Sequence, residues 1–168
     1  MTKHHTSRPD VQLHIRNHEL QASNTHGKRL WKKDFPPGVL VGAEAHGVHV
    51  LVTLSFGLLC LNAETGKNLW RVTFPENRPP TRKMFYEDTV LISFWTSGAY
   101  LHCRTNAFDS ATGRRLWDVV GELKQATKTT VVLERRFPVP DPTAHEEISH
   151  VTLERRTGKE RKPLHAPS

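Results

Sequence analysis

Two pairs of histidines have a spacing that suggests metal binding. The run His145-Glu146-Glu147-Ile148-Ser149-His150 resembles the HExxH motif of zinc proteases, but it contains one residue too many. Its histidines fall at i and i+5, whereas the two ligands of that motif must share one helix face. His46 and His49 flank Gly47-Val48, but the sequence nominates no third ligand beside them. We therefore predict no metal site, and expect His46 and His49 to be solvated turn residues.

The other chemical signatures are incomplete as well. Gly27-Lys28 and its later copies lack the upstream glycine of a phosphate-binding loop. Cys60 and Cys103 form neither a CxxC pair nor a metal-ligand spacing, so we expect reduced thiols rather than a disulfide. No nucleophile stands out. We predict that the chain is not an enzyme, with no catalytic residue, cofactor or metal.

Composition favours a folded chain with an acidic partner. The 168 residues are 36% hydrophobic and 24% charged, which suits one compact domain or array rather than disorder. The formal net charge of +7 raises the expectation of an acidic partner. Residues 1–10 contain no apolar stretch, and no window approaches the roughly 18 consecutive apolar residues of a membrane span. We expect a cytoplasmic protein without membrane contact.

A repeated pentapeptide organises the whole sequence. Glycine, a basic residue, any residue, leucine and tryptophan occur in that order at Gly27–Trp31, Gly66–Trp70 and Gly113–Trp117, and a decayed copy follows at Gly158–Lys162. The four glycines are 39, 47 and 45 residues apart. This is the length of a four-stranded blade of a β-propeller. The elements that must position any site are therefore strands, arranged as four repeats.

The columns around each glycine predict a turn between two strands. Apolar residues occupy the fifth position before the glycine and the third after it, as expected of two strands that share a buried face. The glycine itself can supply the positive φ of a tight connection. Four positions before it stand Ser23, Asn62, Asp109 and Glu154, whose side-chain oxygens can bond turn amides. Further strands are predicted at Val11–Arg16, Glu19–Ser23, Val39–Glu44, Val48–Leu54, Lys83–Tyr86, Thr89–Trp95 and Thr129–Arg135.

Two repeats resemble the signature A-x-D-x-x-T-G-x-x-x-W of the pyrroloquinoline-quinone (PQQ)-like repeat family. The stretch Ala107–Trp117 matches it completely, and Leu61–Trp70 matches most of it. The resemblance implies an all-β fold with about four propeller blades of antiparallel strands. We place the repeat domain at residues 11–165, with blades at 11–35, 36–77, 78–121 and 122–165, after a flexible segment at 1–10.

The resemblance also implies what the repeated residues do. In that family the motif joins the last two strands of a blade, and its tryptophan packs between neighbouring blades. This assigns structural roles to Gly27, Trp31, Gly66, Trp70, Asp109, Gly113, Trp117 and Gly158. Related quinoprotein dehydrogenases use calcium, acidic ligands and often an adjacent cysteine pair beside the quinone. This chain has no adjacent cysteines and about half the usual number of blades, so we expect no PQQ cofactor.

One charged position repeats together with the motif. Directly after the four glycines stand Lys28, Lys67, Arg114 and Lys159. In a propeller they would form a ring on equivalent turns of one face. Arg135-Arg136, Arg155-Arg156 and Arg161-Lys162 add positive charge towards the C-terminus. These residues are either solvated turn residues or a basic face for nucleic acid, and the lack of interleaved aromatic side chains for base stacking favours the first interpretation.

A repeat fold without recognisable chemistry favours a protein-interaction or assembly scaffold. The alternatives are a basic nucleic-acid-binding module and a small-molecule sensor that uses the central channel. We therefore expect a protein partner. The blade count also predicts self-association through the altered first and last repeats, with a compact four-bladed monomer as the alternative.

Overall fold

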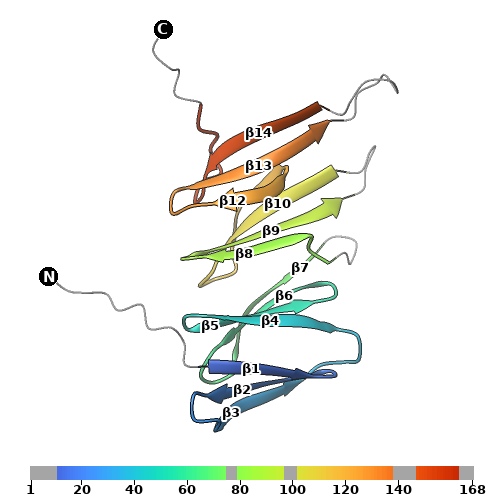
Figure 1. Cartoon of the computed structure of the whole chain (residues 1–168), viewed down its shortest axis with the longest axis vertical. Coiled ribbons are helices and arrows are strands. Elements are labelled where there is room, and N and C mark those ends of the chain that lie inside the picture. Colours follow the sequence, from blue (N-terminus) through green and yellow to red (C-terminus); the bar gives the residue numbers. More distant parts are fainter. Residues whose placement is uncertain (1–10, 75–78, 97–101, 138–146, 163–168) are drawn as a thin grey trace, which may run out of the picture. The chain divides into compact units, whose positions relative to one another are not determined.

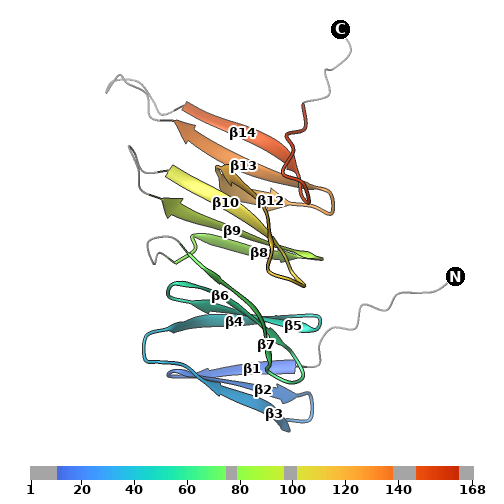
Figure 2. The same ribbon diagram turned by 180° about the vertical axis from the view of Figure 1, so that it is seen from behind.

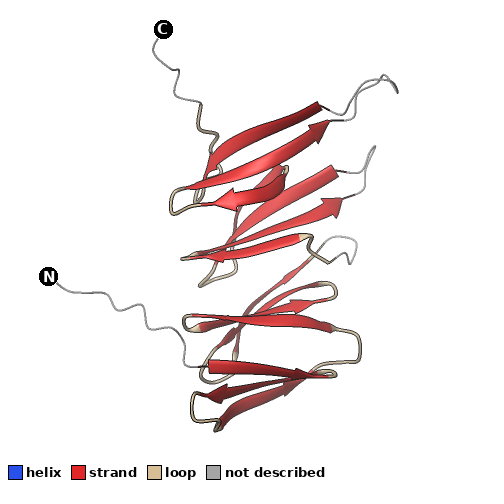
Figure 3. Cartoon of the chain, in the orientation of Figure 1, coloured by secondary structure: helices blue, strands red, loops and turns tan. Residues whose placement is uncertain are grey.

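The computed structural model describes residues 11–74, 79–96, 102–137 and 147–162. These residues form strands, turns and loops, coloured red and tan in Figure 3. Among them no helix is long and apolar enough to cross a membrane. The chain divides into two compact units, residues 1–79 and 80–168. The predicted flexible segment at 1–10 lies outside the described residues.

The first unit contains two antiparallel sheets (Figure 1). Three strands pair in the order β1-β2-β3, and four pair in the order β4-β5-β6-β7. Their bounds are β1 Val11–Arg16, β2 Glu19–Asn24, β3 Arg29–Asp34, β4 Leu40–His46, β5 His49–Leu54, β6 Gly57–Asn62 and β7 Asn68–Thr73. Strands that are neighbours in a sheet are consecutive in the chain, so short turns suffice to connect them.

The second unit also contains two antiparallel sheets, which Figure 2 shows from behind. Four strands pair in the order β11-β10-β9-β8, and three in the order β12-β13-β14. Their bounds are β8 Arg82–Tyr86, β9 Thr89–Thr96, β10 His102–Asp109, β11 Arg115–Val120, β12 Glu122–Ala126, β13 Thr130–Phe137 and β14 Glu147–Glu154. After β14 the chain turns and makes one isolated bridge, from Glu160 to Leu153.

The predicted all-β fold of four antiparallel repeats is confirmed. The strands predicted upstream of each motif are present to within two residues of their ends. The prediction missed β12, whose sequence Glu-Leu-Lys-Gln-Ala has few of the β-branched and aromatic residues that mark strands. Leu123 is the one large apolar residue of β12, and it is 1% exposed. Packing of Leu123 and the backbone pairing with β13, rather than strand propensity, therefore account for β12.

Burial separates the inner strands of the four-stranded sheets from those of the three-stranded sheets. In β5, five consecutive residues from Val50 to Leu54 are buried, and in β9 six consecutive residues from Thr89 to Phe94 are buried. Such continuously buried runs, mostly apolar, are typical of strands covered on both faces. In β2, by contrast, Leu20 and Ala22 are buried while Glu19, Gln21 and Asn24 are partly exposed. The alternation indicates one covered face.

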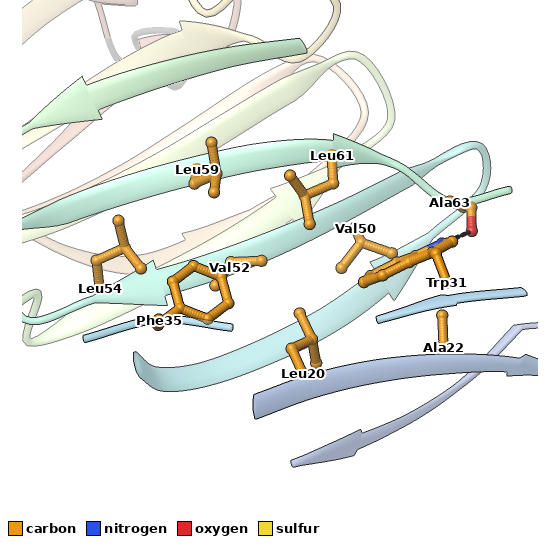
Figure 4. Packing of buried hydrophobic residues seen from close by; sticks show 10 residues of the cluster. All are labelled: Leu20, Ala22, Trp31, Phe35, Val50, Val52, Leu54, Leu59, Leu61 and Ala63. Atoms are coloured by element: carbon orange, nitrogen blue, oxygen red, sulfur yellow. Dashed lines mark hydrogen bonds between the residues drawn. The ribbon is translucent and has the colours of Figure 1, made fainter. Parts of the chain in front are cut away.

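The core of the first unit lies between its two sheets (Figure 4). Leu20 and Ala22 of β2 point towards Val50 and Val52 of β5, and the ring of Trp31 lies across the same layer. All but Trp31 of these five side chains are fully buried. Burying each such aliphatic side chain stabilises the fold by roughly 1.5–3 kcal/mol. The second unit has an equivalent core, formed by Leu91, Ala107, Trp117, Leu123, Val131, Leu133, Val151 and Leu153.

The prediction that the leucine of the motif shares a buried face is wrong for Leu30 and Leu69. They are 39% and 45% exposed. A β-bulge between Ala22 and Ser23 shifts the pairing by one residue, so that Trp31 lies opposite Ala22. The two later motifs have the same bulge, and the resulting pairs are Trp70 with Cys60 and Trp117 with Ala107. Because neighbouring residues of a strand face opposite ways, burial of the tryptophan turns the leucine outward.

Candidate functional site

The repeat turns hold the residues that the sequence singled out. All four repeat glycines have a positive φ, from 68° to 76°. In the second turn, Oδ1 of Asn62 accepts bonds from the backbone N–H of Glu64 (3.0 Å) and of Thr65 (2.9 Å), and from the Thr65 hydroxyl (3.1 Å). These bonds satisfy turn amides that no strand pairs. The polar residue therefore shapes the turn and does not face a ligand.

The third turn repeats this arrangement with a carboxylate. Oδ1 of Asp109 accepts bonds from the N–H of Ala111 (3.1 Å), the N–H of Thr112 (3.0 Å) and the hydroxyl of Thr112 (3.0 Å). Its Oδ2 lies 3.2 Å from a guanidinium nitrogen of Arg156. Burial opposes ionisation, but the Thr112, Arg156 and Ala111 bonds together hold the pKa of Asp109 below its usual value. Asp109 is thus a charged turn residue with its acceptor atoms occupied.

The first and last turns differ from this pattern. In the first turn Asn24, and not the predicted Ser23, accepts bonds from the amides of His26 (3.1 Å) and Lys28 (2.9 Å). The reason is length, because this turn is one residue shorter and Ser23 is buried in β2. In the last turn Glu154 accepts a bond from the hydroxyl of Thr157 (2.8 Å).

Each unit contains one contact between a tryptophan and the next repeat glycine. The indole N–H of Trp31 donates to the carbonyl of Ala63 (2.8 Å), and a Cβ added to Gly66 would lie 2.7 Å from the Trp31 ring. Figure 4 shows the bond to Ala63. In the second unit Trp117 donates to the carbonyl of Arg155 (2.7 Å), and a Cβ on Gly158 would lie 2.6 Å from the Trp117 ring. We call this arrangement the Trp–Gly contact.

The Trp–Gly contact explains why glycine is needed at these two turns. Gly66 and Gly158 combine a positive φ with a neighbouring ring that leaves no space for a side chain. Gly27 has the same φ region but no atom within 4 Å of an added Cβ. Trp70 is also buried, at 8% exposure. The geometry thus gives Trp31 and Trp117 a packing role between neighbouring sheets of one unit.

Arg155 is a buried cation that the sequence did not single out as structural. Its side chain is 5% exposed and lies between the β8–β9 turn and the β12–β13 turn. The guanidinium donates to the carboxylate of Asp88 (2.7 Å), to the carbonyl of Tyr86 (3.0 Å) and to the carbonyl of Lys128 (2.9 Å). It also bonds to the hydroxyl of Thr89 and lies 5.3 Å from the centroid of the Tyr86 ring. Five donors in a planar fork suit this many acceptors.

Arg156 is tied to the same turns. One guanidinium nitrogen lies 3.2 Å from Oδ2 of Asp88 and 3.2 Å from Oδ2 of Asp109. Burial opposes ionisation of Asp88, but bonds from Arg155 and Thr89 outweigh it and lower the pKa of Asp88. From the sequence, Arg155 and Arg156 were interpreted as added positive charge, either solvated or part of a basic face. Neither interpretation fits Arg155, because its side chain is 5% exposed and acceptors of its own unit surround it.

The basic residues after the glycines are exposed in the structure. Lys28 and Lys67 belong to the first unit, Arg114 and Lys159 to the second, and within each unit the two turns lie at the same end of their sheets (Figures 1 and 2). None of the four side chains makes an ion pair with a described residue. A ring of all four stays a prediction.

The turn end of the second unit carries charges of both signs. Its basic residues are Arg114, Arg115, Lys128, Arg155, Arg156, Lys159 and Arg161, and its acidic residues are Glu87, Asp88, Asp109, Glu154 and Glu160. Arg155 and Arg156 pair with Asp88, and Arg156 also pairs with Asp109. Arg136 pairs with Glu134 (2.8 Å), whereas Arg135 donates to the neutral carbonyl of Val120 (3.1 Å) and keeps its charge. Phosphate binding needs uncompensated positive charge, and a basic face at this end stays a prediction.

The candidate metal and thiol residues take no part in a cluster. His46 and His49 pair across the β4–β5 hairpin, and Nε2 of His46 lies 3.1 Å from Oε2 of Glu44. Among the described residues no group of three suits a metal ion. His145 and Glu146 lie outside the described residues. Both cysteines are free and buried, and burial raises the pKa of Cys60 to about 12 and of Cys103 to about 11.

Repeated antiparallel sheets, joined through tryptophan and glycine in each unit, define a protein of the β-propeller repeat class. A family model described as "Outer membrane protein assembly factor BamB" matches residues 16–165. The chain belongs to this family of PQQ-like propeller repeats.

Solved structures support the same class. The quinohemoprotein alcohol dehydrogenase of Comamonas testosteroni is similar, with a TM-score of 0.62 and 16% identity over 92% of this chain and 33% of the enzyme. The alcohol dehydrogenase ADHIIG of Pseudomonas putida HK5 has a TM-score of 0.58 and 14% identity over 92% of this chain and 32% of that enzyme. A europium-containing methanol dehydrogenase has a TM-score of 0.60 and 14% identity over 90% of this chain and 38% of that enzyme.

The chain thus spans about a third of the length of these enzymes. At this identity the likeness concerns the fold. No curated protein matches the chain.

Proposed function

We propose that the chain is a non-catalytic protein-binding module that helps other proteins to assemble. The observation that carries the proposal is the match of residues 16–165 to a family described as an outer membrane protein assembly factor. The polar side chains of Asn62, Asp109 and Arg155 bond to turns of their own unit. This structural role agrees with the proposal. In this proposal the repeated residues maintain the sheets, and their exposed edges and turns contact the partner.

Photo-crosslinking tests this proposal in the cell that makes the protein. A benzophenone amino acid replaces an exposed turn residue, Thr65 or Thr112, or the exposed hairpin residue Val48. We expect at least one position to give a discrete adduct with another protein, which mass spectrometry identifies. Thr105, buried in β10, is the matched control position and should give none. If all three exposed positions gave no adduct, the proposal would fail.

An enzymatic role is the first competing proposal, because the similar solved structures are dehydrogenases. Absorbance titration with PQQ and calcium tests it. We expect no saturable spectral change, and a change that saturates at one quinone per chain would contradict a non-catalytic role.

Nucleic-acid binding is the second competing proposal, and the net charge of +7 favours it. The ion pairs of Arg155 and Arg156 with Asp88 and Asp109 oppose it, because they reduce the free positive charge of the second unit. A shift of mixed DNA or RNA at physiological salt, weakening steeply as salt rises, would support it.

The third competing proposal is that the chain is a small-molecule sensor. A polar hollow of about 320 Å³ lies over the first sheet, lined by Gln12, His14, Arg16, Glu19, Gln21, Ser23 and Gly27. Small-molecule sites are usually lined mainly by apolar side chains. A thermal-shift screen that found a stabilising metabolite would favour this alternative.

A further inference from the structure

The first sheet has one apolar face and one polar face. Its apolar face includes Leu20 and Ala22 of β2, which point into the core of the first unit (Figure 4). Because neighbouring residues of a strand face opposite ways, the other face is formed by three cross-strand pairs. These pairs are Gln12 with Ser23, His14 with Gln21, and Arg16 with Glu19. All six residues line the polar hollow of about 320 Å³ over this sheet, which we call the first-sheet hollow.

Ser23 is the most buried residue of the first-sheet hollow. It is 3% exposed, and its hydroxyl makes no hydrogen bond with any residue in the described part of the chain. Buried polar groups in native proteins nearly always have a partner, and one without a partner needs an explanation. Because Ser23 lines the hollow, a group bound in the hollow can supply the missing bond.

Other side chains of the first-sheet hollow also have free donors. Gln12, Arg16 and Gln21 make no side-chain hydrogen bond with a described residue. Each carboxamide has an NH₂ group that can donate, and the guanidinium is a planar fork of donors that matches the two oxygens of a carboxylate. The hollow therefore suits a group that accepts several hydrogen bonds on neighbouring oxygen atoms.

The charge around the first-sheet hollow favours an acidic occupant. Residues 11–34, which form the first sheet, contain five lysines and arginines against two acidic residues, whereas residues 40–73 of the second sheet contain two of each. Glu19 is the acidic residue of the hollow. Its bond from Lys32 outweighs burial and holds the pKa of Glu19 below its usual value, with further attraction from Arg16 and Arg29. Glu19 is thus compensated, and a surplus of positive charge remains.

The N-terminal segment of the chain does not complement this charge. Residues 1–10 contain Lys3 and Arg8 but only one acidic residue, Asp10. Charges of the same sign repel each other. An acidic segment of another protein complements the hollow better.

We propose that the first-sheet hollow binds a glutamate or aspartate side chain from an acidic segment of a partner protein. This rests on the proposed protein-binding function and adds a surface and a partner charge to it. Arg16 holds the carboxylate in a bidentate pair. Gln21 and Ser23 donate further bonds from the more buried part of the hollow. The lysines and arginines around it attract the neighbouring acidic residues of the segment.

Binding of an acidic peptide tests the proposal on the full chain. The probe is a short fluorescent peptide of alternating glutamate and serine, and the matched probe has glutamine in place of glutamate. We expect the parent to bind the glutamate peptide saturably at physiological salt, and the glutamine peptide roughly tenfold more weakly. Arg16→Gln should weaken binding of the glutamate peptide by roughly tenfold as well. Lys67→Gln removes the same charge at an exposed turn of the second sheet, and this matched control should bind nearly like the parent.

Ser23→Ala separates binding from stability. It removes a hydroxyl that has no partner in the described chain, so the melting temperature should not fall. Binding of the glutamate peptide should nevertheless weaken by about two- to tenfold, because one hydrogen bond to the carboxylate is lost. Unchanged binding by both Arg16→Gln and Ser23→Ala would overturn the proposal. Equal losses for Arg16→Gln and Lys67→Gln would also overturn it, because net charge alone would then explain the attraction.

Competition identifies the source of the carboxylate. Unlabelled glutamate peptide should displace the probe, whereas free glutarate at the same carboxylate concentration should not, because it lacks the neighbouring acidic residues. Displacement by glutarate would overturn the proposal in favour of a small ligand, and stronger displacement by a single-stranded DNA oligonucleotide would overturn it in favour of nucleic acid. A crosslinked partner without any peptide binding would overturn the proposal for the hollow, but would leave the protein-binding function standing on another surface.

Discussion

Gly66→Ala and Gly27→Ala form a matched pair that isolates the Trp–Gly contact. Both glycines follow a hairpin strand and have a positive φ, 68° and 76°. Alanine in this region costs roughly 1–2 kcal/mol. At Gly27 we expect no further cost in stability, because no atom lies within 4 Å of the new Cβ. At Gly66 the Cβ would lie 2.7 Å from the Trp31 ring, and overpacking of this kind costs a further 1–3 kcal/mol or so.

Thermal unfolding followed by circular dichroism measures the difference. We expect a loss of about 1–2 kcal/mol for Gly27→Ala and about 2–5 kcal/mol for Gly66→Ala, at about 2–4 °C per kcal/mol for a chain of this size. Repeating Gly66→Ala in a Trp31→Ala background should remove the extra cost, because the ring is gone. Equal melting temperatures for the two single variants would refute the argument that the ring selects glycine.

Three further predictions follow from burial and charge. Arg155→Met should destabilise the chain by about 2–3 kcal/mol, because several buried acceptors lose a charged donor, whereas Arg161→Ala, at an exposed side chain, should change stability by less than about 0.5 kcal/mol in urea unfolding. The pKa of Asp109 is lowered by folding, so its contribution to stability is present above the usual aspartate pKa of 3.8 and is lost as the pH falls through the lower folded value. The difference in melting temperature between parent and Asp109→Asn should therefore be largest near pH 7 and vanish in acid, and a constant difference would contradict this. Cys60 and Cys103 should not react with a thiol reagent at pH 8 until the chain unfolds, because both are buried and their pKa values are raised; reaction of the folded chain would show that one is accessible.

The local features of the fold were predictable because they depend on residues close in the sequence. The spacing of Gly27, Gly66, Gly113 and Gly158 predicted the repeats, and the polar residue before three of these glycines predicted the bonded turns. Errors arose where a single residue changed the register. The shorter first turn moved the bonding role to Asn24, and the β-bulge turned Leu30 and Leu69 outward.

Contacts between residues that are distant in the sequence could not be predicted from the sequence patterns. Arg155 belongs to a pair of adjacent arginines, which composition alone marks as surface charge. Its partners Tyr86, Asp88 and Lys128 lie in other turns, and only the pairing of the sheets brings them together.

The Trp–Gly contact runs in one direction along the chain, from Trp31 forward to Gly66 and from Trp117 forward to Gly158. A repeat that carries both residues therefore brings its own glycine for the tryptophan before it and its own tryptophan for the glycine after it. Tandem duplication of one whole repeat copies both halves at once, so the new copy fits its neighbours without compensating substitutions elsewhere. Arrays of this kind can grow in evolution by gene duplication alone.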